Sequence, residues 1–318
     1  MHIFVTGATG FIGTAVVKEL LSSGHQVTGL SRTAQGAEKL QKLGAKARVG
    51  RLDQPALLRE AAADSDGVIH LAFMHGLGHM DLMTRLRLFA GALNGGVMSS
   101  FMRILHQTES RAVQALGSGL EGTGRPLIVT SGVLSLPSGK ISTEEDDHRT
   151  DGPNRAFSET AALDFVPRGV RASVIRLAPT VHGSGDRGLI PRLIKAARKK
   201  GSSVYIGDGA NRWPAAHIRD AATLFRLALE KGEAGAKYHG VDETGVPFRE
   251  IASKIAAKLG ITASSCPTPK SAKHLGFLSS FVGLDSPSSS ERTQQALGWK
   301  PTGPGLLADI DQQDYFKI

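Results

Sequence analysis

Three glycines near the start of the chain are spaced so that a backbone turn can receive a phosphate group. They lie in the segment Thr6-Gly7-Ala8-Thr9-Gly10-Phe11-Ile12-Gly13, between an apolar run and a helical pattern. In such a turn the first glycine permits the bend, the second lets the backbone approach a pyrophosphate, and the third lets the helix pack on the sheet. The helix N-terminus then faces the phosphates. The segment predicts a dinucleotide-binding loop, with contacts from Thr6, Gly7, Thr9, Gly10, Phe11, Ile12 and Gly13.

The end of the next apolar run bears on which nicotinamide coenzyme is preferred. A site that prefers NAD places Asp or Glu there, to bond the ribose diol. Here the run ends Gly29-Leu30-Ser31-Arg32-Thr33 and contains no carboxylate. A guanidinium offers a planar fork to phosphate oxygens. Ser31 and Arg32 therefore predict contact with a 2′-phosphate, and the expected cofactor is NADP(H). The alternative is a solvated Arg32 at a strand end.

Short apolar runs alternate with amphipathic segments in the first half of the chain. Strands are expected at His2–Thr6, Gln26–Ser31, Ala45–Gly50, Gly67–Ala72, Pro126–Ser131 and Val170–Leu177. Helices are expected at Ile12–Ser23, Gln35–Leu43, Pro55–Ala63, within Asp81–Leu120, and at Asn154–Val166. This alternation predicts an α/β fold, with a Rossmann-type doubly wound parallel sheet covered on both faces.

The pattern loosens in the second half. Helices are expected at Leu189–Lys200, Arg219–Lys231, Phe248–Leu259 and Ser288–Leu297, between segments rich in Gly, Pro and Ser. We therefore expect a dinucleotide-binding domain over residues 1–180, to which some later segments return. Residues 181–318 are expected to form mainly a smaller substrate-binding lobe near the strand ends, where ligands bind in open α/β sheets.

The glycine spacing resembles that of the short-chain dehydrogenase/reductase superfamily in its extended, epimerase/dehydratase-like form. Four further segments support the resemblance over nearly the whole chain: His70-Leu71-Ala72, Leu177–Gly183 (with His182 in place of the family's Tyr), Gly207–Asp220 and Leu297–Pro301. The resemblance implies a Rossmann-type domain that binds a nicotinamide dinucleotide. It also implies coenzyme contacts from Leu52, Asp53, Leu71, Ala72 and Pro179, with adenine expected against the Leu52 backbone.

The family's usual proton donor and its helper, Tyr-x-x-x-Lys, are missing. None of Tyr205, Tyr238 and Tyr315 has Lys four residues later, and at the matching helix Arg155 and Glu159 take the two places. The resemblance is therefore to the atypical subgroups. Arg155 is expected to hold a carboxylate or an oxyanion, and Glu159 to bond the ribose diol. A plain ion pair on one helix face is the alternative.

Two other residues are candidates for the chemistry. Ser131 matches the family's Ser/Thr region at the end of the fifth strand and is expected to bond a substrate carbonyl. His182 is the expected titratable group near the nicotinamide, because histidine changes charge near neutral pH. Strand-end hydroxyl bonding for Ser131 and plain packing for His182 are the alternatives.

Substrate contacts are expected from two regions. In relatives the second lobe lines the pocket, which indicates Arg187, Arg212, Trp213 and His217, with a surface loop and one buried Trp as the alternative. Phe73 and Met74 begin a segment that holds every methionine after the first, through Met102. Flexible thioethers suit an adaptable apolar surface, so the segment is interpreted as a cap for an apolar substrate, a dimer interface or core packing. His75 and His79 are flanked by glycines, so no metal site is expected.

Composition excludes several classes of protein. The chain has 318 residues, of which 41% are hydrophobic and 21% charged, so it is long enough for a sizeable core and is not disordered. The net charge of +9 is spread along the chain, which fits a phosphate-bearing small molecule and gives no indication of nucleic-acid binding. The absence of a long apolar run or leader, and the single Cys266, predict a cytoplasmic protein without a membrane partner.

Three functions remain open from the sequence. The first is an NADP(H)-dependent oxidoreductase that transfers hydride to or from a carbonyl or activated C=C bond of a small organic substrate. The second is an NADP(H)-binding sensor or scaffold that has lost catalysis. The third is a sugar-nucleotide-type epimerase or dehydratase with bound NAD, against which Arg32 argues. A homodimer is possible in each case.

Overall fold

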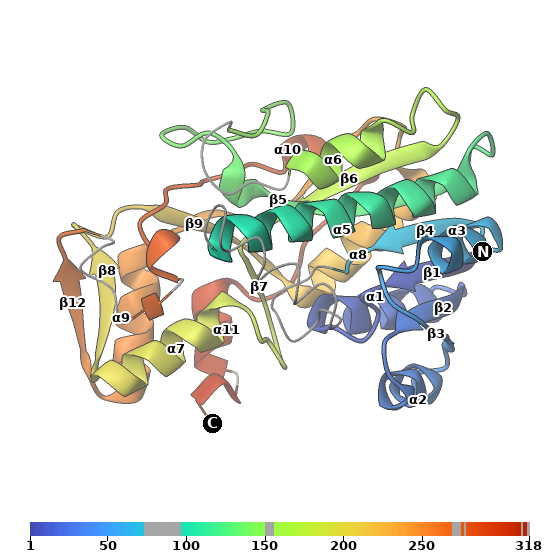
Figure 1. The fold of residues 1–318 in the computed structure, drawn as a ribbon. Coiled ribbons are helices and arrows are strands. Elements are labelled where there is room, and N and C mark those ends of the chain that lie inside the picture. Colours follow the sequence, from blue (N-terminus) through green and yellow to red (C-terminus); the bar gives the residue numbers. More distant parts are fainter. Residues whose placement is uncertain (73–96, 150–155, 269–274, 277, 313, 317–318) are drawn as a thin grey trace. The chain divides into compact units, whose positions relative to one another are not determined.

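The computed structural model describes residues 1–72, 97–149, 156–268, 275–276, 278–312 and 314–316 (Figure 1). The contacts within the chain group its residues into two units. Unit 1 consists of Met1–Thr130, Ala156–Val174 and Ala228–Ala236. Unit 2 consists of Ser131–Arg155, Ile175–Leu227 and Lys237–Ile318. The segments of the two units alternate along the sequence, so each unit contains residues that are far apart in the chain.

A seven-stranded sheet has the strand order β10-β6-β5-β4-β1-β2-β3. Its strands are β1 (His2–Thr6), β2 (Gln26–Ser31), β3 (Lys46–Val49), β4 (Gly67–His70), β5 (Pro126–Gly132), β6 (Arg171–Leu177) and β10 (Lys237–Gly240). Strand β1 pairs in parallel with both β2 and β4, β2 pairs in parallel with β3, and β4 does so with β5. Strand order reverses at β1, which confirms the predicted Rossmann-type doubly wound sheet.

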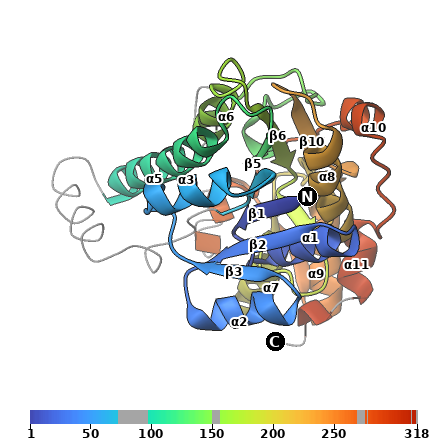
Figure 2. The ribbon, with the colours of Figure 1, turned by 90° about the vertical axis from the view of Figure 1, so that its right-hand side faces the viewer.

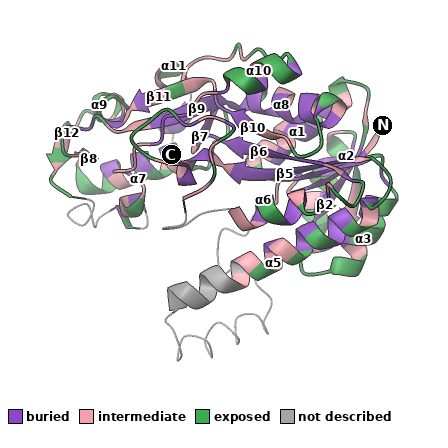
Figure 3. Cartoon of the chain, turned by 90° about the horizontal axis from the view of Figure 1, so that it is seen from above, coloured by how far each residue is buried: buried purple, intermediate pink, exposed green. Residues whose placement is uncertain are grey.

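Helices cover the sheet of unit 1 on both faces (Figure 2). They are α1 (Phe11–Ser22), α2 (Ala34–Lys42), α3 (Pro55–Ala63), α5 (Val97–Leu120) and α6 (Ala156–Leu163). Residues of α3, α5 and α6 pack with β1, β4 and β5 in one apolar cluster that includes Phe4, Leu116 and Phe165. The crossover from β1 to β2 runs in one direction along the sheet, and the crossovers that lead to β4 and β5 run in the opposite direction. Because all of them are right-handed, α1 lies on the face opposite α3 and α5. In Figure 3, α3 and α5 show buried and exposed sides, as expected for helices on a sheet.

Unit 2 contains two small sheets, in the orders β11-β9-β7 and β12-β8. Their strands are β7 (Thr180–His182), β8 (Ser202–Ile206), β9 (Arg212–His217), β11 (Glu243–Pro247) and β12 (Thr262–Cys266). The helices with residues in this unit are α7 (Leu189–Lys200), α8 (Ile218–Lys231), α9 (Phe248–Leu259), α10 (Glu291–Leu297) and α11 (Leu306–Gln312), with short 3-10 turns η2 (Val133–Ser135) and η4 (Asp314–Phe316). Trp213 and Phe248 pack edge to face at 4.8 Å in its core.

The sequence predicted the longer elements better than the short ones. Strands β1 and β2 and helices α3, α7 and α9 have the predicted bounds. The remaining predicted elements differ by a few residues at their ends, and of the segment Asp81–Leu120 the structure describes α5. Strands β7 to β12 were not predicted. None of the described helices combines the length and the apolar character needed to span a membrane.

Candidate functional site

The glycine loop joins β1 to α1, and its three glycines have different surroundings. Gly7 has a φ of +70°, and a Cβ on it would lie 2.8 Å from the backbone nitrogen of Ala72. A Cβ on Gly13 would lie 2.0 Å from the carbonyl oxygen of Gly7, so this glycine lets α1 pack against the loop. Among the described residues, a Cβ on Gly10 would meet the Gly7 carbonyl oxygen alone, at 3.2 Å. The open side of the loop is therefore at Gly10, where a ligand has room to approach the backbone.

The start of α1 fits an anionic group. Gly10 is its N-cap, no side chain caps the helix, and the first turn contains no acidic residue. The first N–H groups of a helix have no intrahelical partner and carry the positive end of its dipole. Exposed Gly10 and the partly buried Phe11 and Ile12 lie at this end. These backbone donors fit the pyrophosphate of a dinucleotide.

The carboxyl ends of β1, β4 and β5 are tied together beside this loop. The Thr6 hydroxyl lies 2.8 Å from His70 Nδ1 and accepts a hydrogen bond from the Ala72 N–H at 3.3 Å. Thr130 donates to the His70 carbonyl oxygen at 3.0 Å. Leu71 follows His70, so the predicted coenzyme residues Thr6, Leu71 and Ala72 lie at one edge of the sheet, where ligands bind in this fold.

The end of β2 lies next to the glycine loop. A Cβ on Gly36 would be 2.2 Å from Ser31 Oγ and 3.3 Å from Thr9 Cγ2, so these three residues are neighbours. Thr33 caps α2 by accepting a hydrogen bond from the Gly36 N–H at 3.1 Å. Arg32 is exposed between them, and the first turn of α2 contains no acidic residue. This strand end thus combines a guanidinium, hydroxyls and a helix N-terminus, which together suit a phosphate group.

In the region predicted to contact adenine, the Asp53 side chain already has a partner. Asp53 accepts two hydrogen bonds from the Arg51 guanidinium, at 3.0 and 2.9 Å. Its carboxylate is therefore already paired, on an exposed part of the chain. Leu52 is partly buried against the core of unit 1.

Of the predicted catalytic residues of unit 1, the structure describes Glu159. It is buried in α6, with 5% of its surface exposed. Its neighbour Ser158 donates to Glu109 of α5 at 2.7 Å, and Phe157 stacks on His106 of α5 at 3.9 Å. These contacts fix α6 against α5. Arg155, Phe73 and Met74 lie outside the described residues.

In unit 2, Ser131 has a neighbour that the sequence analysis missed. Its hydroxyl lies 3.5 Å from His148 Nε2, and the other ring nitrogen, Nδ1, lies 2.6 Å from Ser135 Oγ. Ser131 and Ser135 are buried, whereas His148 is partly exposed. A histidine is thus held between two serines at the end of β5. The only sequence signal is a histidine in the polar run from Glu144 to Arg149.

His182, in contrast, is buried in the interior of unit 2. Its side chain is 1% exposed, and its Nδ1 lies 2.8 Å from Oδ2 of the fully buried Asp309. Next to it, Tyr315 accepts a hydrogen bond from the Gly183 N–H at 3.0 Å and donates to Asp186 at 3.2 Å. Burial raises the pKa of Asp186 to about 6, although hydrogen bonds from Gly188 and Tyr315 oppose this shift.

The other residues predicted to bind substrate have structural partners or lie at the surface. Trp213 has no exposed surface and packs edge to face with Phe248 in the core, which agrees with the alternative of one buried Trp. Arg212 donates to both oxygens of Asp285, at 3.1 and 2.9 Å, so its charge is already paired. His217 lies edge to face with His182 at 5.5 Å, and burial lowers its pKa. Arg187 is exposed, and Pro179 is partly buried between β6 and β7.

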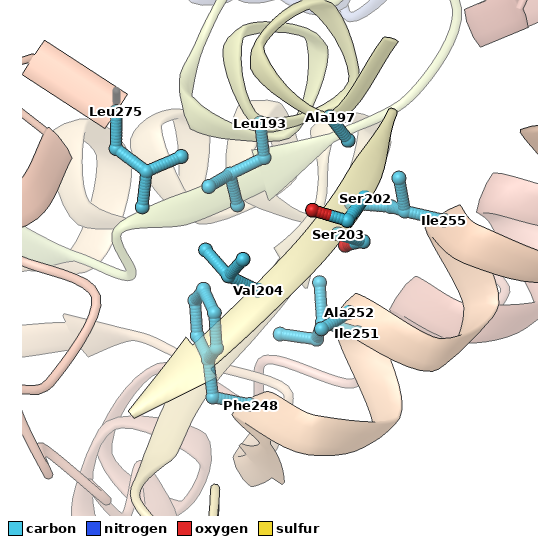
Figure 4. A pocket seen from close by; sticks show the side chains of 10 residues that line it. All are labelled: Leu193, Ala197, Ser202, Ser203, Val204, Phe248, Ile251, Ala252, Ile255 and Leu275. Carbon is cyan, nitrogen blue, oxygen red and sulfur yellow. The ribbon is translucent and has the colours of Figure 1, made fainter. Parts of the chain in front are cut away.

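A small hollow lies in the core of unit 2, between α7, β8 and α9 (Figure 4). Its walls are largely apolar, including Leu193, Val204 and Phe248, with the hydroxyls of Ser202 and Ser203 at one side. None of its lining residues is ionisable, so it offers no group for proton transfer. Within the described part of the chain, no cluster of three or more His, Cys, Asp or Glu is placed to hold a metal ion.

The amino-acid sequence is similar to that of a known family and of several known proteins. A sequence model of the NAD-dependent epimerase/dehydratase family matches residues 3–112 and 158–241. An uncharacterised protein of Schizosaccharomyces pombe is 44% identical over 317 residues, which is 99% of this chain and 100% of that protein. A Stigmatella aurantiaca protein, named as a 4-hydroxy-2-methyl-3-oxo-4-farnesyl-3,4-dihydroquinoline-1-oxide ketoreductase, is 25% identical over 280 residues, which is 87% of this chain and 80% of that protein.

Solved structures share the fold. A dTDP-glucose 4,6-dehydratase from Streptomyces venezuelae, crystallised with NAD and TYD bound, aligns with a TM-score of 0.74. The alignment covers 100% of this chain and 97% of the dehydratase chain at 19% sequence identity.

Proposed function

Because the chain belongs to the NAD-dependent epimerase/dehydratase family, we propose that it is an NADP(H)-dependent oxidoreductase. It transfers hydride between the nicotinamide and a carbonyl group or activated C=C bond of a small, apolar organic substrate. The observation that carries this proposal is the pairing of two neighbouring loops: an open, uncapped glycine loop after β1, and a strand end after β2 that has Arg32 in place of a carboxylate.

In this proposal different residues of the chain bind different parts of the coenzyme. The N–H groups at the start of α1, near Gly10, hold the pyrophosphate. Arg32, with the hydroxyl-bearing turn at Ser31 and Thr33, holds the 2′-phosphate. The Leu52 backbone lies against the adenine. When bound, the coenzyme supplies the hydride, and the protein supplies orientation, an oxyanion partner and a proton.

Three observations support reduction of a carbonyl group in an apolar substrate. The Stigmatella relative is named as a ketoreductase. Ser131, a donor at the carboxyl end of β5, is held beside a histidine, an arrangement suited to a carbonyl oxygen that becomes an alcohol. The apolar character of the substrate is inferred from the run of methionines that begins at Met74.

The test of the proposal is the difference in affinity between two coenzymes. Arg32→Ala should weaken NADPH about 10- to 150-fold and leave NADH nearly unchanged, because a hydrogen bond to a charged group contributes about 1.5–3 kcal/mol. Titration calorimetry with each coenzyme measures both affinities. Arg59→Ala, which changes an exposed arginine of α3 in the same unit, is the matched control. Equal losses for NADPH and NADH in Arg32→Ala would show that Arg32 does not distinguish them.

A further inference from the structure

The chain lacks the tyrosine that the family uses as proton donor, yet it places a histidine beside Ser131. We propose that His148 holds the proton that Ser131 passes to the substrate oxygen, and that Ser135 fixes the orientation of the His148 ring. This inference rests on the proposed reductase function. It assigns the proton to a residue 17 positions after Ser131, in a segment that the sequence motifs do not mark.

The contacts of the His148 ring assign different tasks to its two nitrogens. Nδ1 lies 2.6 Å from Ser135 Oγ, a short hydrogen bond with a serine that is only 6% exposed. Nε2 lies 3.5 Å from Ser131 Oγ, the outer limit for a hydrogen bond. Such contacts are often long before substrate binds and shorten in the complex. In the proposed arrangement Nδ1–H donates to Ser135 Oγ, which leaves Nε2 as the nitrogen that gains and loses a proton.

The segment that carries His148 is held by buried residues at both ends. At its start, Glu144 accepts hydrogen bonds from the Thr293 N–H and hydroxyl, at 2.9 and 2.7 Å. The fully buried Arg176 donates to the Asp146 carbonyl oxygen at 2.7 Å. Directly after His148, the Arg149 N–H donates to the Ser135 carbonyl oxygen at 2.9 Å. The ring is therefore positioned by the surrounding structure, as a proton-transferring group requires.

The proton transfer balances with a carbonyl substrate. Hydride addition to the carbonyl carbon leaves a negative oxygen. That oxygen takes the Ser131 hydroxyl proton while Ser131 Oγ takes the Nε2 proton of the His148 imidazolium. One substrate O–H bond forms and one N–H bond breaks, so the ring becomes neutral and Ser131 is unchanged. His148 is partly exposed and recovers its proton from water, so each turnover consumes one hydride and one proton.

Charged groups lie on the segment that carries His148 or bond to it from other elements. Asp146, Asp147 and Arg149 lie on this segment, Arg176 of β6 donates to the Asp146 carbonyl oxygen, and Lys237 of β10 pairs with Asp147. Asp147 is paired with Lys237 at 2.8 Å, and Asp146 is paired with Lys140. The hydrogen-bond contacts of the ring nitrogens used in the proposal are those with Ser131 and Ser135.

The first experiment measures turnover against pH with a panel of ketones and enones. His148→Gln should lower kcat about 100-fold or more and leave the Kd of NADPH within twofold. It should also change how the reduction rate depends on pH, because the imidazolium is the proposed proton source. Ser135→Ala should reduce kcat less and change the pH profile. Ser118→Ala, which changes an exposed serine of α5 whose hydroxyl bonds within its own helix, is the matched control and should change neither.

The second experiment needs no turnover. Imidazole nitrogen NMR of labelled protein, with the His148 signal assigned by its loss in His148→Gln, should show the neutral ring protonated at Nδ1. Ser135→Ala should shift that proton toward Nε2. A neutral ring protonated at Nε2 in the parent protein, or one unaffected by Ser135→Ala, overturns the assignment.

The outcomes separate the two proposals. Reductase turnover that His148→Gln leaves unchanged, with the same pH profile, overturns the role of His148 and leaves the proposed function standing. NADPH binding without turnover of any substrate in the panel contradicts the proposed function, and the proton transfer with it. A large loss of kcat with an altered pH profile and intact NADPH binding supports both.

Discussion

Two histidines of unit 2 show opposite surroundings. His182 is 1% exposed and bonded to a carboxylate, Asp309, that has no exposed surface. His148 is partly exposed and lies between the hydroxyls of Ser131 and Ser135. A buried carboxylate holds an imidazole in place but gives it no route to water. Two hydroxyls and an exposed edge leave one nitrogen able to exchange its proton. The comparison accompanies our proposal that His148 transfers a proton, and it suggests a stabilising role for His182 that the variants below test.

The largest expected effect is a loss of stability, which tests whether the buried pair of His182 and Asp309 stabilises unit 2. Asp309→Ala removes one partner of a buried pair, which typically costs about 3–5 kcal/mol. The urea midpoint of unfolding should fall accordingly. Asp311→Ala is the matched control on the same helix, because Asp311 forms surface ion pairs with Lys254 and Lys258 and such pairs contribute little. Equal shifts in both variants would contradict the anchoring role of Asp309.

The next effect depends on pH. Burial raises the pKa of Asp186 from 3.8 in the unfolded chain to about 6. The folded state therefore binds the proton more tightly, so this group's contribution is complete below pH 4 and is lost as pH rises to 6. The loss amounts to up to about 3 kcal/mol. Urea denaturation at pH 4.5 and 7.5 should show that Asp186→Asn gains stability over the parent at the higher pH. A constant difference between the two proteins would refute this linkage.

The smallest effect separates the two histidines directly. His182→Gln should lower the free energy of unfolding by about 1–2 kcal/mol, because the Asp309 hydrogen bond is weakened. Its turnover per folded molecule should equal that of the parent. His148→Gln should do the reverse, with a normal urea midpoint and a large loss of kcat. If His182→Gln abolishes turnover while the protein remains folded, His182 is the proton donor first expected from the sequence.

Local sequence predicted the glycine loop between β1 and α1 because its signals are adjacent. Gly7, Gly10 and Gly13 lie within seven residues, and the strand before them and the helix after them follow from hydrophobic periodicity. Gly13 comes close to the carbonyl oxygen of Gly7, which is near it in the sequence. Gly7 itself also comes close to Ala72, which is far from it in the sequence. Periodicity similarly gave the bounds of β1, β2, α3, α7 and α9.

The parts that the sequence did not predict depend on distant contacts. Strand β9 pairs with β7 and β11, and β12 pairs in parallel with β8, so these short strands are defined by partners elsewhere in the chain. The position of His148 depends on Thr293, which bonds Glu144 across 149 residues. The edge-to-face contact of Trp213 with Phe248 joins residues 35 positions apart, so the sequence alone could not predict it.

The His182–Asp309 pair also constrains how the protein can be made. Its two residues are 127 positions apart, and a ribosome adds about 5–20 residues per second. Roughly 6–25 s therefore pass between the synthesis of His182 and that of its partner. During this interval His182 lacks its hydrogen bond to Asp309, and the apolar faces of α7 and α9 lack the residues of α11 that join their cluster. The core of unit 2 can therefore be completed only late in synthesis.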